Sequence, residues 1–146
     1  MTHADELQWL VDRTHITDAI VRYTIAVDTR DWELLDSVFV DGAAIDYRES
    51  GGVQTTYPES KKWLAETLPT FFASWQHTLG QVAIDIVGDE ADVVAYFMNP
   101  MVFKAPDGSA GNVVDLGGYY EHSFVRTSEG WRSKSVTEKI LWKRGL

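Results

Sequence analysis

The sequence predicts an α+β domain in which helices come first and a sheet of long strands follows. Apolar residues recur at helical spacing through the first third of the chain, and apolar and polar residues alternate through most of the rest. The turn sequences "GDE", "APDGSAG" and "SEG" divide that rest into long extended segments. Neighbouring strands joined by short turns pair antiparallel, so we expect a mostly antiparallel sheet. No internal repeat is visible, and residues 1–146 are predicted to form one domain.

The first helix is expected over residues 5–27, where apolar residues keep a helical period. Thr17 can cap a fresh turn inside it, which would place a break at residues 14–18. A short second helix is expected from about Trp32 to Phe39, with Asp31 as its N-cap.

A short strand and a third helix come next. "AAIDYR" alternates, so Ala43, Ile45 and Tyr47 share one face of a strand. The helix "ESKKWLAETLPTFF" is expected to begin after Pro58. It should bend or end near Pro69, because proline has no backbone N–H.

The remaining extended segments are expected to be strands at residues 75–87, 91–104, 112–127 and 131–142. "LGG" and "NP" interrupt two of them, and glycine inside a strand often marks a bulge that curls a sheet. Helices laid across the concave face of a curled sheet would form a cone with an apolar interior. Such an interior suits small apolar molecules.

Charge and composition exclude several classes of partner. The net charge is −9, from 22 acidic and 13 basic residues, so no nucleic-acid partner and no membrane partner is expected. The chain has no cysteine, and its four histidines lack metal-binding spacing, so no metal is expected. No glycine-rich loop joins a strand to a helix, so no nucleotide cofactor is expected. Without a visible signal peptide or membrane span, the protein is predicted to be cytoplasmic.

Several polar side chains fall on apolar faces of the expected strands. Asn99 shares a face with Phe97 and Phe103, and His122 shares one with Tyr120. All of these residues are therefore predicted to face the cone and to bind a substrate. A structural role stays open for both polar side chains, since a lone histidine in a strand more often belongs to the core. An asparagine before proline can also mark a bulge.

Asp28 stands where the apolar face of the first helix ends, and it could act there as a simple cap or turn residue. His77 shares parity with Trp75 and Leu79, whereas the isoleucines that follow have the opposite phase. A bulge near Gly80 would reconcile the two patterns.

The order of several motifs resembles a known family. From Tyr23 the chain reads Y-x4-D-x2-D-W-x-x-L, and "IDY", "QH" and the hairpin "GGYYEHSFVRTSEGW" follow. These motifs resemble the SnoaL-like branch of the NTF2-like (cystatin-like fold) superfamily, over nearly the whole chain. The resemblance implies an NTF2-like cone, with three N-terminal helices packed on a strongly curved, mostly antiparallel sheet.

Within that branch the motifs look most similar to those of scytalone dehydratase and bile-acid 7α-dehydratase. The resemblance implies these catalytic and pocket residues: Asp28 and His77 as a pair, Tyr23 as a catalytic tyrosine, and Tyr47 in the pocket. This sequence departs from the pattern at two places. "NPMVFK" has no second histidine near Phe103, and Val27 replaces a second pocket tyrosine. The substrate of scytalone dehydratase is therefore not assigned to this chain.

An Asp–His pair without a Ser or Cys nucleophile is suited to proton abstraction. Neutral imidazole is a fair base near neutral pH, and a buried aspartate would fix its tautomer. Taking a proton beside a leaving group gives elimination, and taking one beside a carbonyl gives isomerisation. Our leading hypothesis is a cofactor-free, dehydratase-type lyase that acts on a small hydrophobic cyclic substrate, with Tyr23 and Tyr47 as hydrogen-bond donors.

Two alternatives stay open. The same pair would serve a ketosteroid-isomerase-like or polyketide-cyclase-like isomerase. The cone could also be a non-catalytic module for ligand binding or oligomerisation, since a fold does not fix a function. An open sheet face and six tryptophans favour a homodimer or homotrimer.

Overall fold

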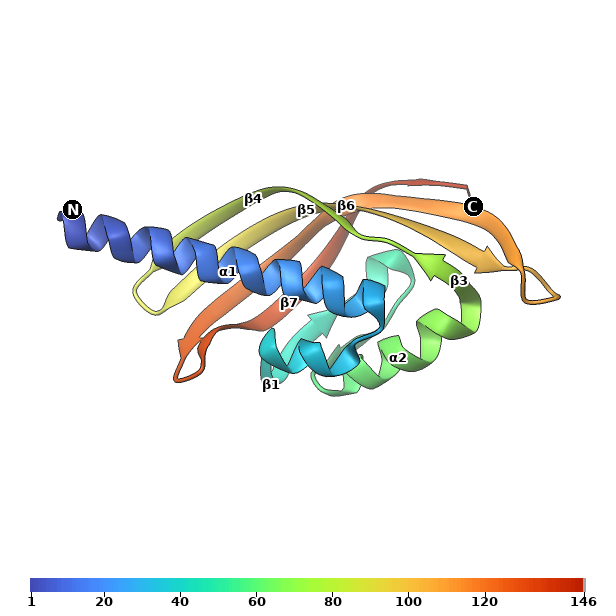
Figure 1. Ribbon diagram of the computed structural model, residues 1–146, viewed down its shortest axis with the longest axis horizontal. Helices are drawn as coiled ribbons and strands as arrows, with labels where there is room; N and C mark the ends of the chain where they lie inside the picture. The colour runs from blue at the N-terminus through green and yellow to red at the C-terminus, as the bar shows by residue number, and fades with distance from the viewer. Residues whose placement is uncertain (146) are drawn as a thin grey trace.

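The computed structural model describes residues 1–145, with three helices, α1, η1 and α2, set against a curled seven-stranded mixed sheet that forms a half-barrel (Figure 1). The predicted α+β cone is therefore confirmed. The elements are α1 (His3–Thr29), η1 (Trp32–Ser37), β1 (Phe39–Asp46), η2 (Arg48–Ser50), β2 (Gln54–Thr56), α2 (Glu59–Phe71), β3 (Phe72–Trp75), β4 (Thr78–Val87), β5 (Glu90–Lys104), β6 (Ala110–Thr127) and β7 (Gly130–Arg144). The strand order is β2-β1-β7-β6-β5-β3, with β4 also paired to β5, and only the β1–β7 pair among these is parallel.

Helix α1 is one uninterrupted helix of 27 residues. Thr2 and Asp5 form a capping box at its start, in which each side chain accepts the backbone N–H of the other. The break expected at residues 14–18 is absent, because the buried stripe continues through Ile16 and holds the helix on the sheet. At the other end, Arg30 takes the left-handed conformation, with φ 60°, and caps the helix.

The second expected helix is a short 3₁₀ helix, η1, which ends at Ser37 before the chain enters β1 at Phe39. Arg22 of α1 donates to the Ser37 carbonyl at 3.0 Å, and this bond holds the end of η1. Asp31 occupies the N-cap position of this helix, as predicted, but its side chain makes no capping hydrogen bond. Its backbone N–H instead donates to the Ala26 carbonyl and prolongs the end of α1.

Helix α2 begins after Pro58, as expected, and continues past Pro69 to Phe71. Pro69 lies in the last turn, where a missing N–H removes only one intrahelical bond. The backbone N–H of Phe72 donates to the Leu68 carbonyl and closes that turn. The helix therefore ends close to Pro69, at Phe71, and not at the proline itself.

The first long predicted strand is in fact two strands, β3 and β4, which pair with different parts of β5. The chain leaves the ladder at Gln76 and His77, opposite Pro100, which has no N–H to continue the pairing. The register of β4 then shifts beside Gly80, where a bulge was predicted. This break frees His77 from the alternation of a strand.

A second irregularity curls β6 against β7, where the register shifts between Gly117 and Gly118. A Cβ atom on Gly117 would lie 2.0 Å from the ring of Trp142. One on Gly118 would lie 1.9 Å from the carbonyl oxygen of Lys139. Only glycine allows such a close approach, and the resulting bulge bends the sheet around the helices.

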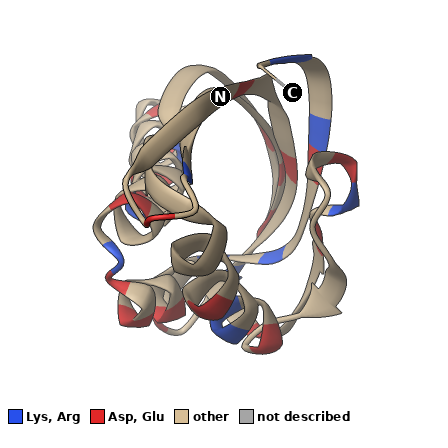
Figure 2. Ribbon diagram, turned by 90° about the vertical axis from the view of Figure 1, so that its right-hand side faces the viewer, with Lys and Arg blue, Asp and Glu red and all other residues tan. Residues whose placement is uncertain are grey.

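Two apolar clusters fill the space between the helices and the sheet. One lies under the middle of α1 against β5 and β6, and the other joins the end of α1 to η1, β1 and α2. Figure 2 shows the helices closing one side of the curled sheet, with many acidic residues on them. Among residues 1–145, no helix is both long and apolar enough to cross a membrane.

An ion pair between the buried Asp12 and the partly exposed Arg126 ties α1 to β6 and β7. The Asp12 carboxylate accepts two bonds from the Arg126 guanidinium, at 2.7 and 2.9 Å, and one from the Trp131 indole N–H at 3.0 Å. Chiefly through Arg126, the pKa of Asp12 is lowered to about 2. The carboxylate therefore stabilises the fold above the ordinary pKa of aspartate, and this contribution is lost as the pH falls toward 2.

Replacing Asp12 by alanine is expected to lower the free energy of unfolding by about 1–3 kcal/mol at neutral pH, because the partly exposed Arg126 loses one of its two carboxylate partners and keeps Asp89. Urea unfolding measures this difference, which should shrink toward pH 2. Asp18→Ala, at an exposed site on the same helix, is the control and should stay within about 0.5 kcal/mol of wild type. Equal losses in the two variants would contradict a stabilising role for the ion pair.

Candidate active site

Asp28 and His77 meet where the end of α1 lies against the break between β3 and β4. Asp28 Oδ1 lies 2.6 Å from His77 Nδ1. Asp28 Oδ2 accepts the backbone N–H of His77 at 2.8 Å. Because one carboxylate holds both the ring and the main chain of His77, the orientation of the imidazole is fixed.

The imidazole is enclosed, whereas the carboxylate is partly open. The side chain of His77 is 6% exposed and that of Asp28 is 22% exposed. With Asp28 as the acceptor, the neutral ring carries its proton on Nδ1. Nε2 is then the unprotonated nitrogen, and it can take a proton from a molecule beside it.

A cavity of about 270 Å³ lies beside His77. This volume is close to the lower limit for ligand pockets, about 300–1,000 Å³. Side chains from α1, α2, β3 and β5 form most of its apolar wall, including Val27, Trp63, Leu64, Phe72, Met101 and Phe103. The cavity therefore suits a small apolar molecule.

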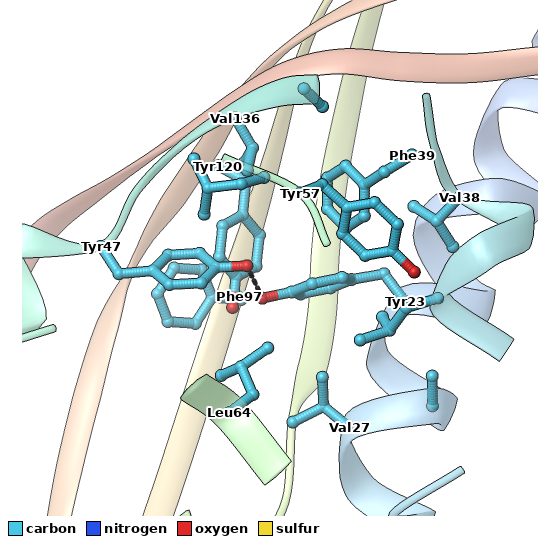
Figure 3. Packing of buried hydrophobic residues seen from close by; sticks show 14 of the residues in the cluster. Tyr23, Val27, Val38, Phe39, Tyr47, Tyr57, Leu64, Phe97, Tyr120 and Val136 are labelled. Carbon is cyan, nitrogen blue, oxygen red and sulfur yellow. Dashed lines mark hydrogen bonds between the residues drawn. The ribbon is translucent and has the colours of Figure 1, made fainter. Parts of the chain in front are cut away.

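Three buried tyrosines form a polar cluster in this apolar wall. Tyr23 of α1 and Tyr47, directly after β1, bring their hydroxyls within 2.8 Å of each other (Figure 3). Tyr120 of β6 stacks on Phe97 with ring centroids 4.3 Å apart, and it meets the ring of Tyr23 edge-on at 5.4 Å. Burial raises the pKa of all three phenols well above the ordinary value, so they remain protonated hydrogen-bond donors.

Asn99 and Glu138 complete the polar part of the wall. They are 5% and 6% exposed, and both line the cavity. Within the described chain, Asn99 Oδ1, Tyr120 Oη and Glu138 Oε1 are buried without a hydrogen-bond partner. Buried polar atoms are normally paired, so three such atoms around one cavity are suited to pair with polar groups of a ligand.

Glu138 was not predicted from the sequence, although a signal was present. It lies two residues from Val136 and two from Ile140, so strand alternation places it on their face. Val136 is buried at 1% exposure, and Ile140 packs against the same cluster. An acidic residue on an apolar face of the last strand was therefore visible in the pattern.

The structure places four of the predicted substrate-binding residues on the cavity wall: Tyr47, Asn99, Phe103 and Tyr120. Phe97 lies behind Tyr120, and neither it nor His122 lines the cavity. His122 Nδ1 lies 2.8 Å from Ser133 Oγ, and burial lowers the pKa of His122 to about 3. His122 is therefore a neutral core histidine. Within residues 1–145, no group of three or more acidic or histidine side chains is placed to hold a metal ion.

Replacing Glu138 by glutamine is expected to stabilise the fold increasingly as the pH rises. Burial raises the pKa of Glu138 in the folded protein. Between the ordinary and the folded pKa, the folded state binds more protons than the unfolded state, so the stability of wild type falls as the pH rises. Each unit of pKa corresponds to about 1.4 kcal/mol. Melting temperatures at pH 4 and pH 8 measure the effect against Glu121→Gln, at an exposed site on β6. If the difference in melting temperature between Glu138→Gln and wild type does not change with pH, this prediction is contradicted.

Comparisons with known proteins identify relatives of this chain. A family model for the SnoaL-like domain matches residues 8–137. An uncharacterised protein of Mycobacterium tuberculosis is 40% identical over 121 residues, which cover 83% of this chain and 80% of that protein. A protein of Mycobacterium bovis matches equally well.

Solved structures share the fold. A type 2 hexachlorocyclohexane dehydrochlorinase (LinA) superposes with a TM-score of 0.83 at 18% identity, covering 97% of this chain and 93% of its own. A scytalone dehydratase-like protein from Novosphingobium aromaticivorans gives a TM-score of 0.80 at 21% identity, covering 94% and 89%. At these identities the likeness shows the fold alone.

Proposed function

Since the chain belongs to the SnoaL-like domain family, we propose that it is a cofactor-independent lyase that removes a small leaving group from a small, hydrophobic, cyclic molecule. The observation that carries this proposal is the contact between Asp28 and His77 Nδ1 beside the cavity. The names of two structural neighbours, a dehydrochlorinase and a dehydratase-like protein, both describe eliminations and support the same reaction type.

In the proposed reaction, His77 Nε2 takes a proton from a carbon atom next to the carbon that bears the leaving group. The electron pair of the broken C–H bond forms a C=C bond, and the leaving group departs. Asp28 stabilises the imidazolium that forms and keeps the ring turned toward the cavity. Asp28 thus positions the base and does not itself take the proton.

The walls of the cavity provide the remaining requirements. Trp63, Leu64 and Phe103 give the cavity an apolar wall, which lowers the local dielectric and strengthens the electrostatic interactions inside. Because the hydroxyls of Tyr23 and Tyr47 hydrogen-bond each other, one of them keeps a free hydrogen. That hydroxyl can donate to a carbonyl on the substrate, where negative charge develops during proton abstraction. A carbonyl beside the reacting carbon would also acidify its proton.

Wild-type protein incubated with β-chlorocyclohexanone tests the proposal, because loss of HCl gives cyclohexenone, whose formation absorbance records directly. The expected result is cyclohexenone formation that is saturable and faster than in buffer alone. Calorimetry of the same mixture measures binding. Binding of the ketone without turnover would contradict the lyase and would favour a ligand-binding module.

A further inference from the structure

We propose that Glu138 donates a proton to the leaving oxygen of the substrate, so that the cavity favours loss of water from a hydroxylated ring over loss of halide. The step rests on the proposed elimination by His77 and adds to it the acid that expulsion of hydroxide requires. Hydroxide is a very poor leaving group, since water is a very weak acid, whereas chloride departs without a proton.

The position of Glu138 carries the inference. Its side chain is 6% exposed, it lines the same cavity as His77, and Oε1 has no hydrogen-bond partner within the described chain. Tyr120 Oη, on the neighbouring strand, is also unpaired. A substrate hydroxyl in the cavity beside these two side chains would pair both atoms and would receive a hydrogen bond from the carboxylic acid.

Glu138 is better suited than the tyrosines to release a proton. Burial raises the pKa of Glu138 and so favours its protonated form, and the nearby Glu49 raises the pKa further. Contacts with Ser50 and Tyr120 oppose that rise. The pKa values of the three phenols are themselves raised well above 10, so these groups can donate hydrogen bonds but are much weaker acids than a carboxyl group.

The positive charge on protonated His77 lowers the pKa of Glu138. As His77 Nε2 takes the proton from carbon, Glu138 therefore becomes a stronger acid at the moment when the C–O bond breaks. The C–H electron pair forms the C=C bond, the C–O electron pair leaves with oxygen, and the Glu138 proton converts that oxygen to water. Imidazolium and carboxylate remain, and water carries a proton from His77 back to Glu138.

The test compares Glu138→Gln with wild type on two probes, β-hydroxycyclohexanone and β-chlorocyclohexanone. Glutamine keeps the shape and can hydrogen-bond, but it has no proton to transfer. We expect kcat for the hydroxyketone to fall by about 10²–10⁴-fold, a much larger loss than for the chloroketone, whose leaving group needs no proton. Glu121→Gln, at an exposed site on β6, is the matched control and should leave both rates as in wild type.

Infrared difference spectra give a readout that does not depend on activity. Wild-type protein at neutral pH is expected to show the C=O band of a protonated carboxyl group that disappears in Glu138→Gln and persists in Glu121→Gln. If that band is missing in wild type, Glu138 holds no proton to donate and the inference is overturned.

The kinetic outcomes separate the inference from the function on which it rests. Equal losses on both ketones in Glu138→Gln, or no loss on either, overturn the inference and leave the elimination intact. If wild type turns over the chloroketone but not the hydroxyketone, the inference is also overturned and the elimination stays intact. If wild type turns over neither ketone, the proposed lyase is itself contradicted, and the inference falls with it.

Discussion

Replacing His77 by glutamine is expected to lower kcat for elimination from β-chlorocyclohexanone by about 10²–10⁴-fold, because the variant has no base in the cavity. Glutamine is close to histidine in size, so the apolar wall around it should remain and KM should change little. Steady-state kinetics on purified, folded variant measure both constants. A fall in kcat at nearly constant KM is the signature of a group that acts in the transition state.

His15→Gln is the matched control for this variant. His15 is exposed on α1, about two turns before Tyr23, where that helix begins to line the cavity. Its replacement should leave kcat unchanged. Full activity of His77→Gln would show that the base is another group. A matching loss in His15→Gln would point instead to general damage to the fold.

Replacing Asp28 by asparagine is expected to lower kcat by about 10³–10⁴-fold with the fold intact. Asparagine fits the site, but its amide has one acceptor where the carboxylate has two. In the variant, the amide oxygen would accept the backbone N–H of His77, and the amide NH₂ would face His77 Nδ1. The ring would therefore carry its proton on Nε2. The variant would then present the wrong tautomer to the substrate and would lack the charge that stabilises the imidazolium.

The tautomer can be followed separately from the rate. Nitrogen-15 NMR of histidine-labelled protein should show the His77 proton on Nδ1 in wild type and on Nε2 in Asp28→Asn. Asp31→Asn is the control, because Asp31 is exposed just beyond α1 and its side chain makes no capping bond. An unchanged tautomer together with an unchanged kcat in Asp28→Asn would remove Asp28 from the proposed mechanism.

The outline of the fold could be predicted because long elements carry a clear period. Residues 5–27 repeat at helical spacing, and the helix forms there without the break that Thr17 suggested, since tertiary packing outweighs one local cap. The split between β3 and β4 could not be predicted from that strand alone. It depends on Pro100 in the strand opposite, which is 24 residues from Gln76 in sequence and adjacent to it only in the fold.

The candidate site could be predicted only in part. Asp28 and His77 are 49 positions apart, so no local pattern joins them, and the family motifs supplied the pair. Strand alternation identified Asn99 and Tyr120 but also selected His122, which is on an apolar face without reaching the cavity. Parity gives the face of a strand, whereas the position of a cavity along that face depends on where α2 lies. The homodimer or homotrimer remains a prediction.

The central claim is that a C–H proton moves to His77 Nε2. It is tested most directly with β-chlorocyclohexanone deuterated at the carbon between the carbonyl and the chlorine-bearing carbon. Proton transfer to His77 requires wild-type protein to convert the deuterated ketone more slowly than the ordinary one in single-turnover reactions. Equal rates for the two ketones, together with undiminished turnover by His77→Gln, would contradict it.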